Sequence, residues 1–280
     1  NMKKFLAVVM TAVLAMTVLT ACGSDKSSDK KETKNETTQV ETIDATGATF
    51  VADGVLTVGA EMGYAPFETL QKDGKTPEGF DIDIITEVAK RLGLKVNFIN
   101  TSFDGILGKI GKDYDVVCSA VTINADRKKA VLFSTPYITN YQTVVVKKGS
   151  DLKINSLNDL DGKSVGVQKG TTSDQLMSEY KSTKTINVEV AANDKLLNCF
   201  TQLTNGEIDA VVVDSTVADS FVAKNPDKYE KAYSDTKEPE EFGIAIGKDN
   251  AKLQEAINKA LAGMDKDGFL KDTADYWFSK

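Results

Sequence analysis

The sequence predicts an α/β fold made of two similar lobes with a ligand cleft between them. Strand-like and helix-like segments alternate along residues 55–118, and the same alternation starts again along residues 163–214. Such alternation is typical of parallel sheets covered by helices, and its repetition predicts two lobes. Because open α/β sheets bind ligands beyond the carboxyl ends of their strands, two facing lobes predict a cleft.

The first run of alternating segments opens with a strand at residues 55–60. The spacing of acidic and apolar residues then predicts a helix over Asp81–Leu92, and Gly93 suits the left-handed residue that ends it. Asp81 and Asp83 are interpreted as a helix cap and an exposed helix face. The remaining elements of this run are expected to be a strand at 95–99, a helix at 104–110, a buried strand at 115–118 and a β-rich run at 142–147.

The second run repeats the pattern. We expect strands at 163–168 and 187–191 and a further apolar strand within 206–214, with helices at 173–180 and 194–204. Residues 206–214 have the same form as residues 113–119: an acid, an apolar run and a polar residue at the strand exit. Two closing helices are expected at 250–264 and 268–278, with Tyr276-Trp277-Phe278 packing within a lobe.

Composition excludes several classes of function. The 280 residues contain no histidine, which rules out histidine bases and the usual zinc sites, and neither a metal nor a cofactor is expected. The net charge of −7 argues against a nucleic-acid partner and against a broad basic membrane patch. Two of the three cysteines, Cys118 and Cys199, lie in apolar stretches and are expected to be buried free thiols.

The N-terminal residues predict export. Lys3 and Lys4 precede an almost wholly apolar stretch from Phe5 to Ala21, too short for a typical bilayer span but suited to a secretory signal. Its end, Leu19-Thr20-Ala21-Cys22, resembles a lipobox, which implies a signal peptide over residues 1–22 and lipidation of Cys22. The alternative is an ordinary membrane anchor. Residues 23–50 are expected to form a polar, flexible tether. The protein is therefore expected to be anchored by lipid at the outer face of the cell membrane, or in the periplasm where an outer membrane exists.

Arg127 is the residue that most clearly indicates a ligand. It follows the buried strand at 115–118, a run of small residues and the hydroxyl of Thr122. Free backbone groups at a strand end, a hydroxyl and the planar donors of a guanidinium suit the carboxylate and amine of a small zwitterion. The alternative is a surface arginine at a helix start.

A series of motifs between residues 50 and 280 resembles the amino-acid-binding members of the bacterial extracellular solute-binding proteins, family 3, which serve ABC importers. The motifs are Tyr64-Ala65-Pro66-Phe67-Glu68, Gly79-Phe80-Asp81-Ile82-Asp83, Phe103-Asp104-Gly105, Val121-Thr122-Ile123 with Arg127-Lys128-Lys129, Phe133-Ser134-Thr135-Pro136-Tyr137, Gly166-Val167-Gln168-Lys169-Gly170-Thr171-Thr172 and Ile208-Asp209-Ala210.

The resemblance implies a two-lobed, type II periplasmic-binding-protein-like fold, each lobe a mostly parallel sheet flanked by helices. Lobe 1 is expected over 51–138 and 241–280, lobe 2 over 142–237, and a hinge near 137–141 and 237–241. Expected partners are an L-amino acid and the permease subunits of an ABC transporter, and the protein is expected to act as a monomer.

The resemblance also assigns roles to single residues. Arg127 pairs with the ligand carboxylate, Thr122 contacts both ligand termini, and the backbone carbonyl of Ala120 accepts from the amine. From the second lobe, the loop Gly170-Thr171-Thr172 gives backbone N–H groups to the carboxylate, and Asp214 binds the amine. Asp214 could instead cap the helix that follows it.

Four further positions concern the ligand side chain. Tyr64 and Phe103 match an aromatic pair that encloses it, although both could be plain core residues. Glu61 matches an acidic position that reaches toward it, or is a solvated loop acid. Gln168 stands where glutamine-binding relatives carry lysine, which puts glutamine, glutamate and aspartate in doubt.

We therefore expect a binding protein rather than an enzyme, with a ligand that is lysine, arginine, ornithine or cystine. The alternatives are a dehydratase on the same scaffold and a sensor domain. The lack of histidine and of any evident pair of buried acids argues against the enzyme.

Overall fold

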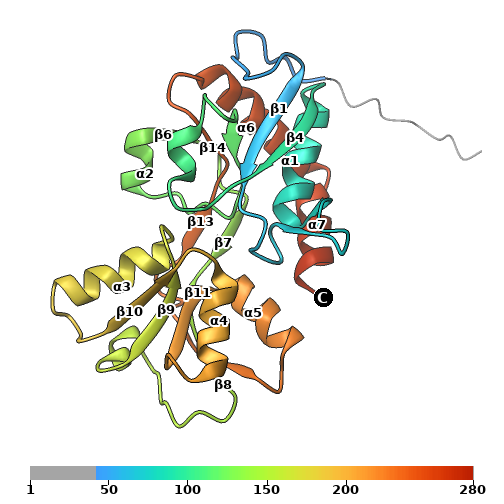
Figure 1. Ribbon diagram of the computed structural model, residues 1–280. Coiled ribbons are helices and arrows are strands. Elements are labelled where there is room, and N and C mark those ends of the chain that lie inside the picture. The colour runs from blue at the N-terminus through green and yellow to red at the C-terminus, as the bar shows by residue number, and fades with distance from the viewer. Residues whose placement is uncertain (1–41, 280) are drawn as a thin grey trace, which may run out of the picture. The chain divides into compact units, whose positions relative to one another are not determined.

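The computed structural model describes residues 42–279, and these contain two five-stranded sheets with helices around each (Figure 1). The strands of the first sheet are β1 (Val55–Ala60), β4 (Lys95–Asn100), β5 (Val116–Val117), β6 (Val131–Phe133) and β14 (Ala245–Gly247). Those of the second are β8 (Gln142–Lys147), β9 (Ser164–Gln168), β10 (Glu189–Asn193), β11 (Ala210–Asp214) and β12 (Tyr229–Ser234). A small hairpin, β2 (Thr69–Leu70) with β3 (Pro77–Glu78), lies apart from both.

The two sheets share one topology. Their strand orders are β4-β1-β5-β14-β6 and β10-β9-β11-β8-β12. The first three strands of each order run parallel, and the fourth, β14 or β8, is antiparallel to both of its neighbours. The predicted two-lobed α/β fold, with a mostly parallel sheet in each half, is therefore confirmed.

The chain crosses between the sheets twice. It leaves the first sheet after β6 and enters the second at β8, then leaves the second after β12 and returns at β14. The two crossing segments, β7 (Ile138–Asn140) and β13 (Glu240–Phe242), pair as an antiparallel two-stranded ribbon. Two strands thus connect the halves, as Figure 1 shows between the upper and lower parts of the molecule.

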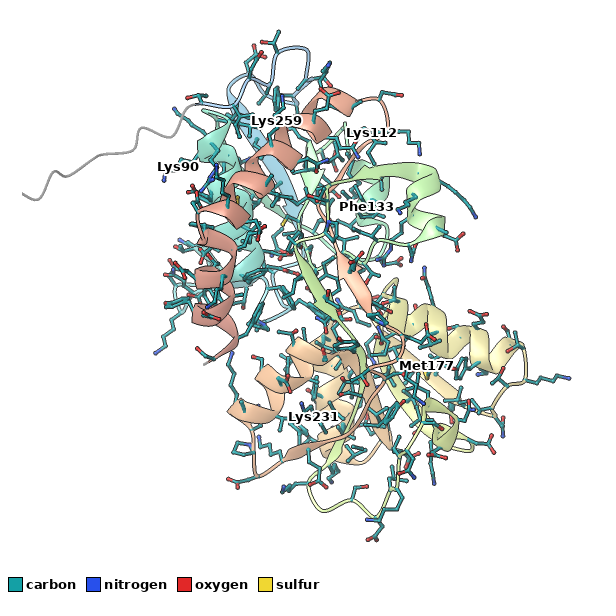
Figure 2. The ribbon with its side chains drawn as sticks, turned by 180° about the vertical axis from the view of Figure 1, so that it is seen from behind. Lys90, Lys112, Phe133, Met177, Lys231 and Lys259 are labelled. Atoms are coloured by element: carbon teal, nitrogen blue, oxygen red, sulfur yellow. The ribbon has the colours of Figure 1, made fainter. Side chains whose placement is uncertain are left out.

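Helices accompany each sheet. The first has α1 (Phe80–Arg91), the short α2 (Ala125–Ala130), α6 (Ala251–Lys266) and α7 (Phe269–Phe278); the second has α3 (Thr172–Ser182), α4 (Leu196–Asn205) and α5 (Ser215–Lys224). Met177 of α3 is fully buried in the core of the second sheet, whereas Lys231 on β12 is exposed at its side-chain tip and pairs with Asp219 (Figure 2).

Trp277 and Phe278 pack against the core as predicted, but the prediction is wrong for Tyr276, which is 56% exposed. The ring of Phe278 lies 4.7 Å from that of Phe80 and 5.6 Å from that of Phe67, while the Trp277 Nε1 donates to Asp83 Oδ2 at 2.7 Å. Fully burying a ring such as that of phenylalanine stabilises a core by about 1.5–3 kcal/mol, and the partly buried Phe278 contributes a part of that. Helix α7 is thereby held against α1, and Asp83 is a partner of Trp277 rather than part of a free surface.

Three predictions need correction. The helix expected at 104–110 is only a 3₁₀ turn, Ile106–Lys109, because Gly105 and Gly111 adopt positive φ angles of 77° and 81° on either side of it. Asp81 does not cap α1: Gly79 holds that position, and Asp81 is fully buried inside the helix. The tether was predicted to extend to residue 50, which is too far along the chain. Ile43 N donates to Arg91 O and Phe50 packs on the core, so both residues belong to the folded part.

The predicted signal peptide, Cys22 and residues 23–41 of the tether lie outside the described residues. Cys118 and Cys199 are buried free thiols, as expected. Between residues 42 and 279, none of the helices has both the length and the apolar composition needed to cross a bilayer.

Candidate functional site

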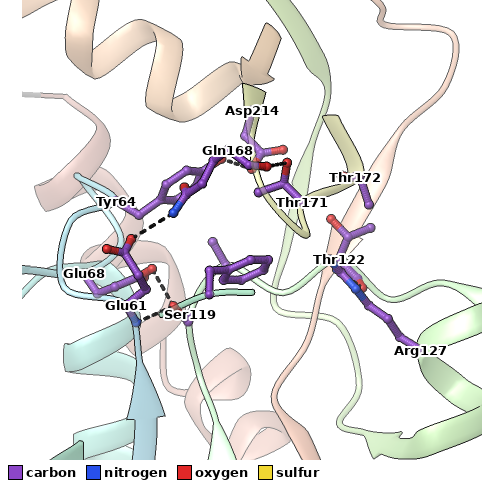
Figure 3. Close-up of a pocket in the computed structure, with 12 residues that line it drawn as sticks. Glu61, Tyr64, Glu68, Ser119, Thr122, Arg127, Gln168, Thr171, Thr172 and Asp214 are labelled. Carbon is purple, nitrogen blue, oxygen red and sulfur yellow. Dashed lines mark hydrogen bonds between the residues drawn. The ribbon is translucent and has the colours of Figure 1, made fainter. Parts of the chain in front are cut away.

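A pocket lies where the carboxyl ends of four strands, two from each sheet, face one another (Figure 3). Glu61 follows β1 and Ser119 follows β5, while Gln168 ends β9 and Asp214 ends β11. The cavity left between these side chains has a volume of about 10 Å³, which is about the space of one water molecule. Its lining comprises Glu61, Tyr64, Glu68, Phe103, Ser119, Ala120, Thr122, Arg127, Gln168, Thr171, Thr172 and Asp214.

Arg127 reaches both halves of the molecule from α2. Asn124 caps that helix by accepting from Arg127 N at 2.9 Å, which sets the start of the helix and the place of the side chain. The guanidinium donates from Nη1 to Thr122 O at 2.9 Å and from Nη2 to Gly170 O at 3.0 Å. It also lies 5.7 Å from the ring centre of Phe103. Arg127 is thus a buried cation held in a defined orientation at the pocket wall.

Asp214 supplies an opposite charge from the second sheet. Its Oδ2 accepts from the Tyr64 hydroxyl at 2.5 Å, and its Oδ1 is buried without a hydrogen-bond partner among the described residues. Burial, followed by the negative charge of Glu240, raises the pKa of Asp214 to about 7, against the Tyr64 hydrogen bond and the charge of Arg127. The side chain does not cap α5. An unpartnered buried carboxylate oxygen is what a ligand ammonium would satisfy.

Glu68 is a second buried acid in the pocket wall. Ser119 Oγ donates to its Oε1 at 2.8 Å, while its Oε2 is also without a partner among the described residues. Beneath it, Asp81 Oδ2 accepts from Ala120 N at 2.6 Å and from the Tyr137 hydroxyl at 2.9 Å. Burial, and next the charge of Asp81, raises the pKa of Glu68 well above its usual range. The expectation that the protein lacks a pair of buried acids is therefore wrong.

Glu61 is buried but already paired. Its side chain is 1% exposed, and Lys195 Nζ forms an ion pair with its Oε1. Gln168 Nε2 lies 3.4 Å from its Oε2. Both partners come from the second half of the molecule, so the carboxylate is held across the pocket, and the reading of Glu61 as a solvated loop acid is wrong.

Two pocket hydroxyls share one carboxylate of the crossing strand β13. Thr122 Oγ1 and Thr172 Oγ1 donate to Glu240 Oε2 at 2.9 and 2.8 Å, and Gln142 Nε2 donates to Glu240 Oε1 at 3.1 Å. Thr171 Oγ1 instead donates to Gln168 O at 2.7 Å and accepts from Asp174 N at 3.2 Å as the cap of α3. Glu240 therefore links residues from both sheets beside the pocket.

The structure brings together ten of the eleven residues predicted for the site. The exception is Gly170, whose N–H donates to Asp174 Oδ2 at 3.0 Å and whose carbonyl accepts from Arg127. Ala120 lines the pocket with a positive φ of 49°, a strained conformation for a residue with a side chain. Tyr64 and Phe103 both line the pocket, so neither is only a core residue.

Sequence reasoning missed Glu68, Ser119 and Lys195. Glu68 was part of a quoted motif, Tyr64-Ala65-Pro66-Phe67-Glu68, so a signal existed, but nothing in the sequence placed its side chain. Ser119 follows a strand end of the predicted kind and could have been proposed on that ground. Lys195 carried no signal, because its role depends on a residue 134 positions away.

Comparisons with known proteins show the family of this chain. Residues 56–280 match the bacterial extracellular solute-binding proteins, family 3. The L-cystine-binding protein TcyJ of Escherichia coli strain K12 is 36% identical over 229 residues, which cover 80% of this chain and 83% of TcyJ.

Two solved structures are similar over most of the chain. An ancestral arginine-binding protein bound to arginine is 42% identical with a TM-score of 0.76, covering 80% of this chain and 98% of that one. The ancestral amino acid-binding protein AncCDT-1, a precursor of cyclohexadienyl dehydratase, is 36% identical with a TM-score of 0.73, covering 80% of this chain and 96% of that one.

Proposed function

Because the chain belongs to the bacterial extracellular solute-binding proteins of family 3, we propose that it captures a free L-amino acid and delivers it to an ABC importer. The observation that carries the proposal is the presence of Arg127 and Asp214 in one closed pocket. A zwitterion that enters such a pocket loses the hydration of both of its charges, so each charge needs a charged partner. Arg127 is suited to the carboxylate and Asp214 to the ammonium.

For the ligand side chain we propose a cationic group, as in arginine, lysine or ornithine, with cystine as the second candidate. Glu68 supports this assignment. It lines the pocket, and its buried Oε2 is without a partner among the described residues. Because Asp214 is assigned to the ligand ammonium, the carboxylate of Glu68 is left for a second positive charge, on the ligand side chain. A ligand cation beside Glu68 would offset the free-energy cost of burying its charged carboxylate. Cystine, the ligand of TcyJ, would place its second ammonium there.

Replacing Glu68 with glutamine is expected to reduce the preference for arginine over citrulline, its neutral isostere, by at least about tenfold. Truncating one partner of a desolvated charge pair typically costs about 2–5 kcal/mol, and citrulline is spared because it carries no side-chain charge. Titration calorimetry with both ligands on both proteins measures the ratio. Glu87→Gln is the matched control, since Glu87 pairs with Arg91 outside the pocket. An unchanged ratio in Glu68→Gln would exclude Glu68 as the side-chain partner.

An enzyme on the same scaffold is the second candidate function. The buried acids Glu68 and Asp81 support it, because an acid with a raised pKa can serve as a proton donor. AncCDT-1 is a precursor of a dehydratase but is itself an amino acid-binding protein, as TcyJ is an L-cystine-binding protein. Incubation with amino acids and prephenate-like acids, followed by measurement of substrate loss, distinguishes the two. Tight binding without turnover supports the binding protein.

We further propose that residues 51–138 with 241–280 and residues 142–237 act as two lobes that close around the ligand. The paired crossing strands β7 and β13 support this, because two short connections are typical of hinge closure. Both Arg127 and Glu61 contact residues of the opposite half, so the described arrangement corresponds to a closed pocket.

Cys22 is proposed to be the lipidated N-terminal residue of the mature protein, at the outer face of the cell membrane. The motif Leu19-Thr20-Ala21-Cys22 after an apolar stretch supports it. Two acyl chains give stable anchoring where one gives only about 10⁴ M⁻¹. We expect Cys22→Ser to release the protein from the membrane or leave it unprocessed, as fractionation would show. Mass spectrometry that finds an unmodified Cys22 on membrane-bound protein contradicts the proposal.

A further inference from the structure

The ion pair between Glu61 and Lys195 crosses the pocket. Glu61 follows β1 of the first sheet, and Lys195 immediately precedes α4 of the second. Gln168, at the end of β9, approaches the other oxygen of the same carboxylate at 3.4 Å. The second half of the molecule therefore holds both oxygens of a carboxylate that belongs to the first half.

The two partners differ in their surroundings. The Glu61 side chain is 1% exposed, whereas that of Lys195 is 49% exposed. A buried carboxylate is unfavourable without a positive partner, so Glu61 needs a cation whenever the pocket is closed. Lys195 is not among the residues that line the pocket. Its side chain keeps contact with solvent, so its ammonium is already partly hydrated and can leave the carboxylate for water.

We propose that Lys195 is an internal competitor for the side-chain subsite and the residue that limits selectivity for cationic amino acids. Its ammonium holds the carboxylate of Glu61, a second pocket acid besides Glu68 with which the cationic group of a ligand would otherwise pair. A cationic ligand gains from Glu61 only what remains after Lys195 is displaced. A neutral ligand leaves the pair intact. The inference rests on the proposed function, because it assumes an amino-acid ligand whose side chain approaches Glu61.

The same ion pair is expected to stabilise the closed form of the ligand-free protein. Lys195 connects the two halves through the acid that a cationic ligand would bind, so it imitates one contact of the ligand. Its removal is therefore expected to shift the ligand-free protein toward an open form and, separately, to make Glu61 available to ligands. Only the second effect distinguishes cationic from neutral ligands, because closure is common to both.

The test compares Lys195→Met with Lys169→Met. Lys169 is a suitable control because it pairs with Asp194 at 2.9 Å within the second half, so this ion pair does not connect the two halves. Titration calorimetry gives the ratio of the dissociation constants of citrulline and arginine for each protein. We expect Lys195→Met to raise this ratio about tenfold, which corresponds to about 1.4 kcal/mol, and Lys169→Met to leave it unchanged. The double variant Glu61→Gln/Lys195→Met should lose the increase, since the acid is gone.

The outcomes separate the two proposals. A ratio in Lys195→Met equal to that of the unmutated protein overturns the role of Lys195, even if both ligands bind more weakly, because an equal loss reports closure alone. If the unmutated protein binds no amino acid, the proposed function fails. Small-angle scattering of the ligand-free proteins then tests the link between the two halves through Lys195. Equal radii of gyration for Lys195→Met and the unmutated protein overturn the cross-pocket link. Where Lys195→Met does not fold, Lys195→Gln serves in its place, because it keeps a polar partner for Glu61 without the charge.

Discussion

Replacing Arg127 with methionine is expected to weaken the binding of every amino-acid ligand by about two to four orders of magnitude. The guanidinium is buried, is fixed by Thr122 O and Gly170 O, and is the one cationic side chain among the described residues that line the pocket. Removing one partner of a buried charge pair costs about 3–5 kcal/mol, which gives this range of dissociation constants. Arg127→Lys should lose most of the affinity too, because an ammonium cannot reproduce the planar fork. Titration calorimetry measures both.

Two controls make this prediction specific. Arg91 is the other arginine of the chain, and it is buried between Glu87 and Asp267 outside the pocket, so Arg91→Met should lower stability without changing affinity in the protein that remains folded. Agmatine, which is arginine without its carboxylate, should lose far less on Arg127→Met than arginine does. If Arg127→Met binds arginine within about tenfold of the unmutated protein, a difference of about 1.4 kcal/mol, the assignment of Arg127 to the ligand carboxylate is wrong.

Amino-acid affinity is expected to fall as the pH drops below about 7, through Asp214. Its pKa is raised to about 7 by burial and by Glu240, with Tyr64 and Arg127 opposing the shift. The ligand ammonium needs the charged carboxylate, so a protonated Asp214 must first lose its proton. Well below this pKa, each further drop of one pH unit is expected to weaken binding about tenfold. Calorimetry of one ligand between pH 5 and pH 8 measures the profile.

Stability of the ligand-free protein should follow the opposite trend. A carboxyl whose pKa is higher in the folded than in the unfolded protein binds more protons when folded, so its contribution to stability is present below pH 4 and is lost as the pH rises through about 7. Asp81, with its pKa also raised to about 7 by burial, adds to this trend. Ligand-free protein is therefore expected to resist urea better at pH 5 than at pH 8.

Asp214→Asn isolates the residue. The variant should bind amino acids more weakly by about 2–5 kcal/mol at pH 8, and its affinity should vary much less with pH. Asp115→Asn is the control, because Asp115 is a buried carboxyl that accepts from Val51 N and Thr57 N, outside the pocket. A profile that keeps its slope in Asp214→Asn shows that another group, with Glu68 the first to examine, carries the pH dependence.

The sequence by itself determined the α/β class, the repetition of the pattern and the end of α1 just before Gly93, because these depend on contacts between near neighbours. The periodicity of apolar residues marked the buried strands, and the polar residues after each strand end were correctly predicted to meet. Arg127 and Thr122 were indicated by the strand end that precedes them, whereas the role of Asp214 was implied by the resemblance to family 3. The 104–110 helix failed because two glycines with positive φ decided the local backbone.

Only the tertiary structure decided which charges face each other inside the pocket. Whether Glu61 is open to a ligand depends on Lys195, and whether Glu68 is ionised depends on its burial beside Asp81. Gly170 likewise offers its carbonyl to Arg127 and not its N–H to the pocket, because Asp174 accepts that N–H. Desolvation and pairing across the two halves depend on distances between residues far apart in the chain, and no local pattern in the sequence records those distances.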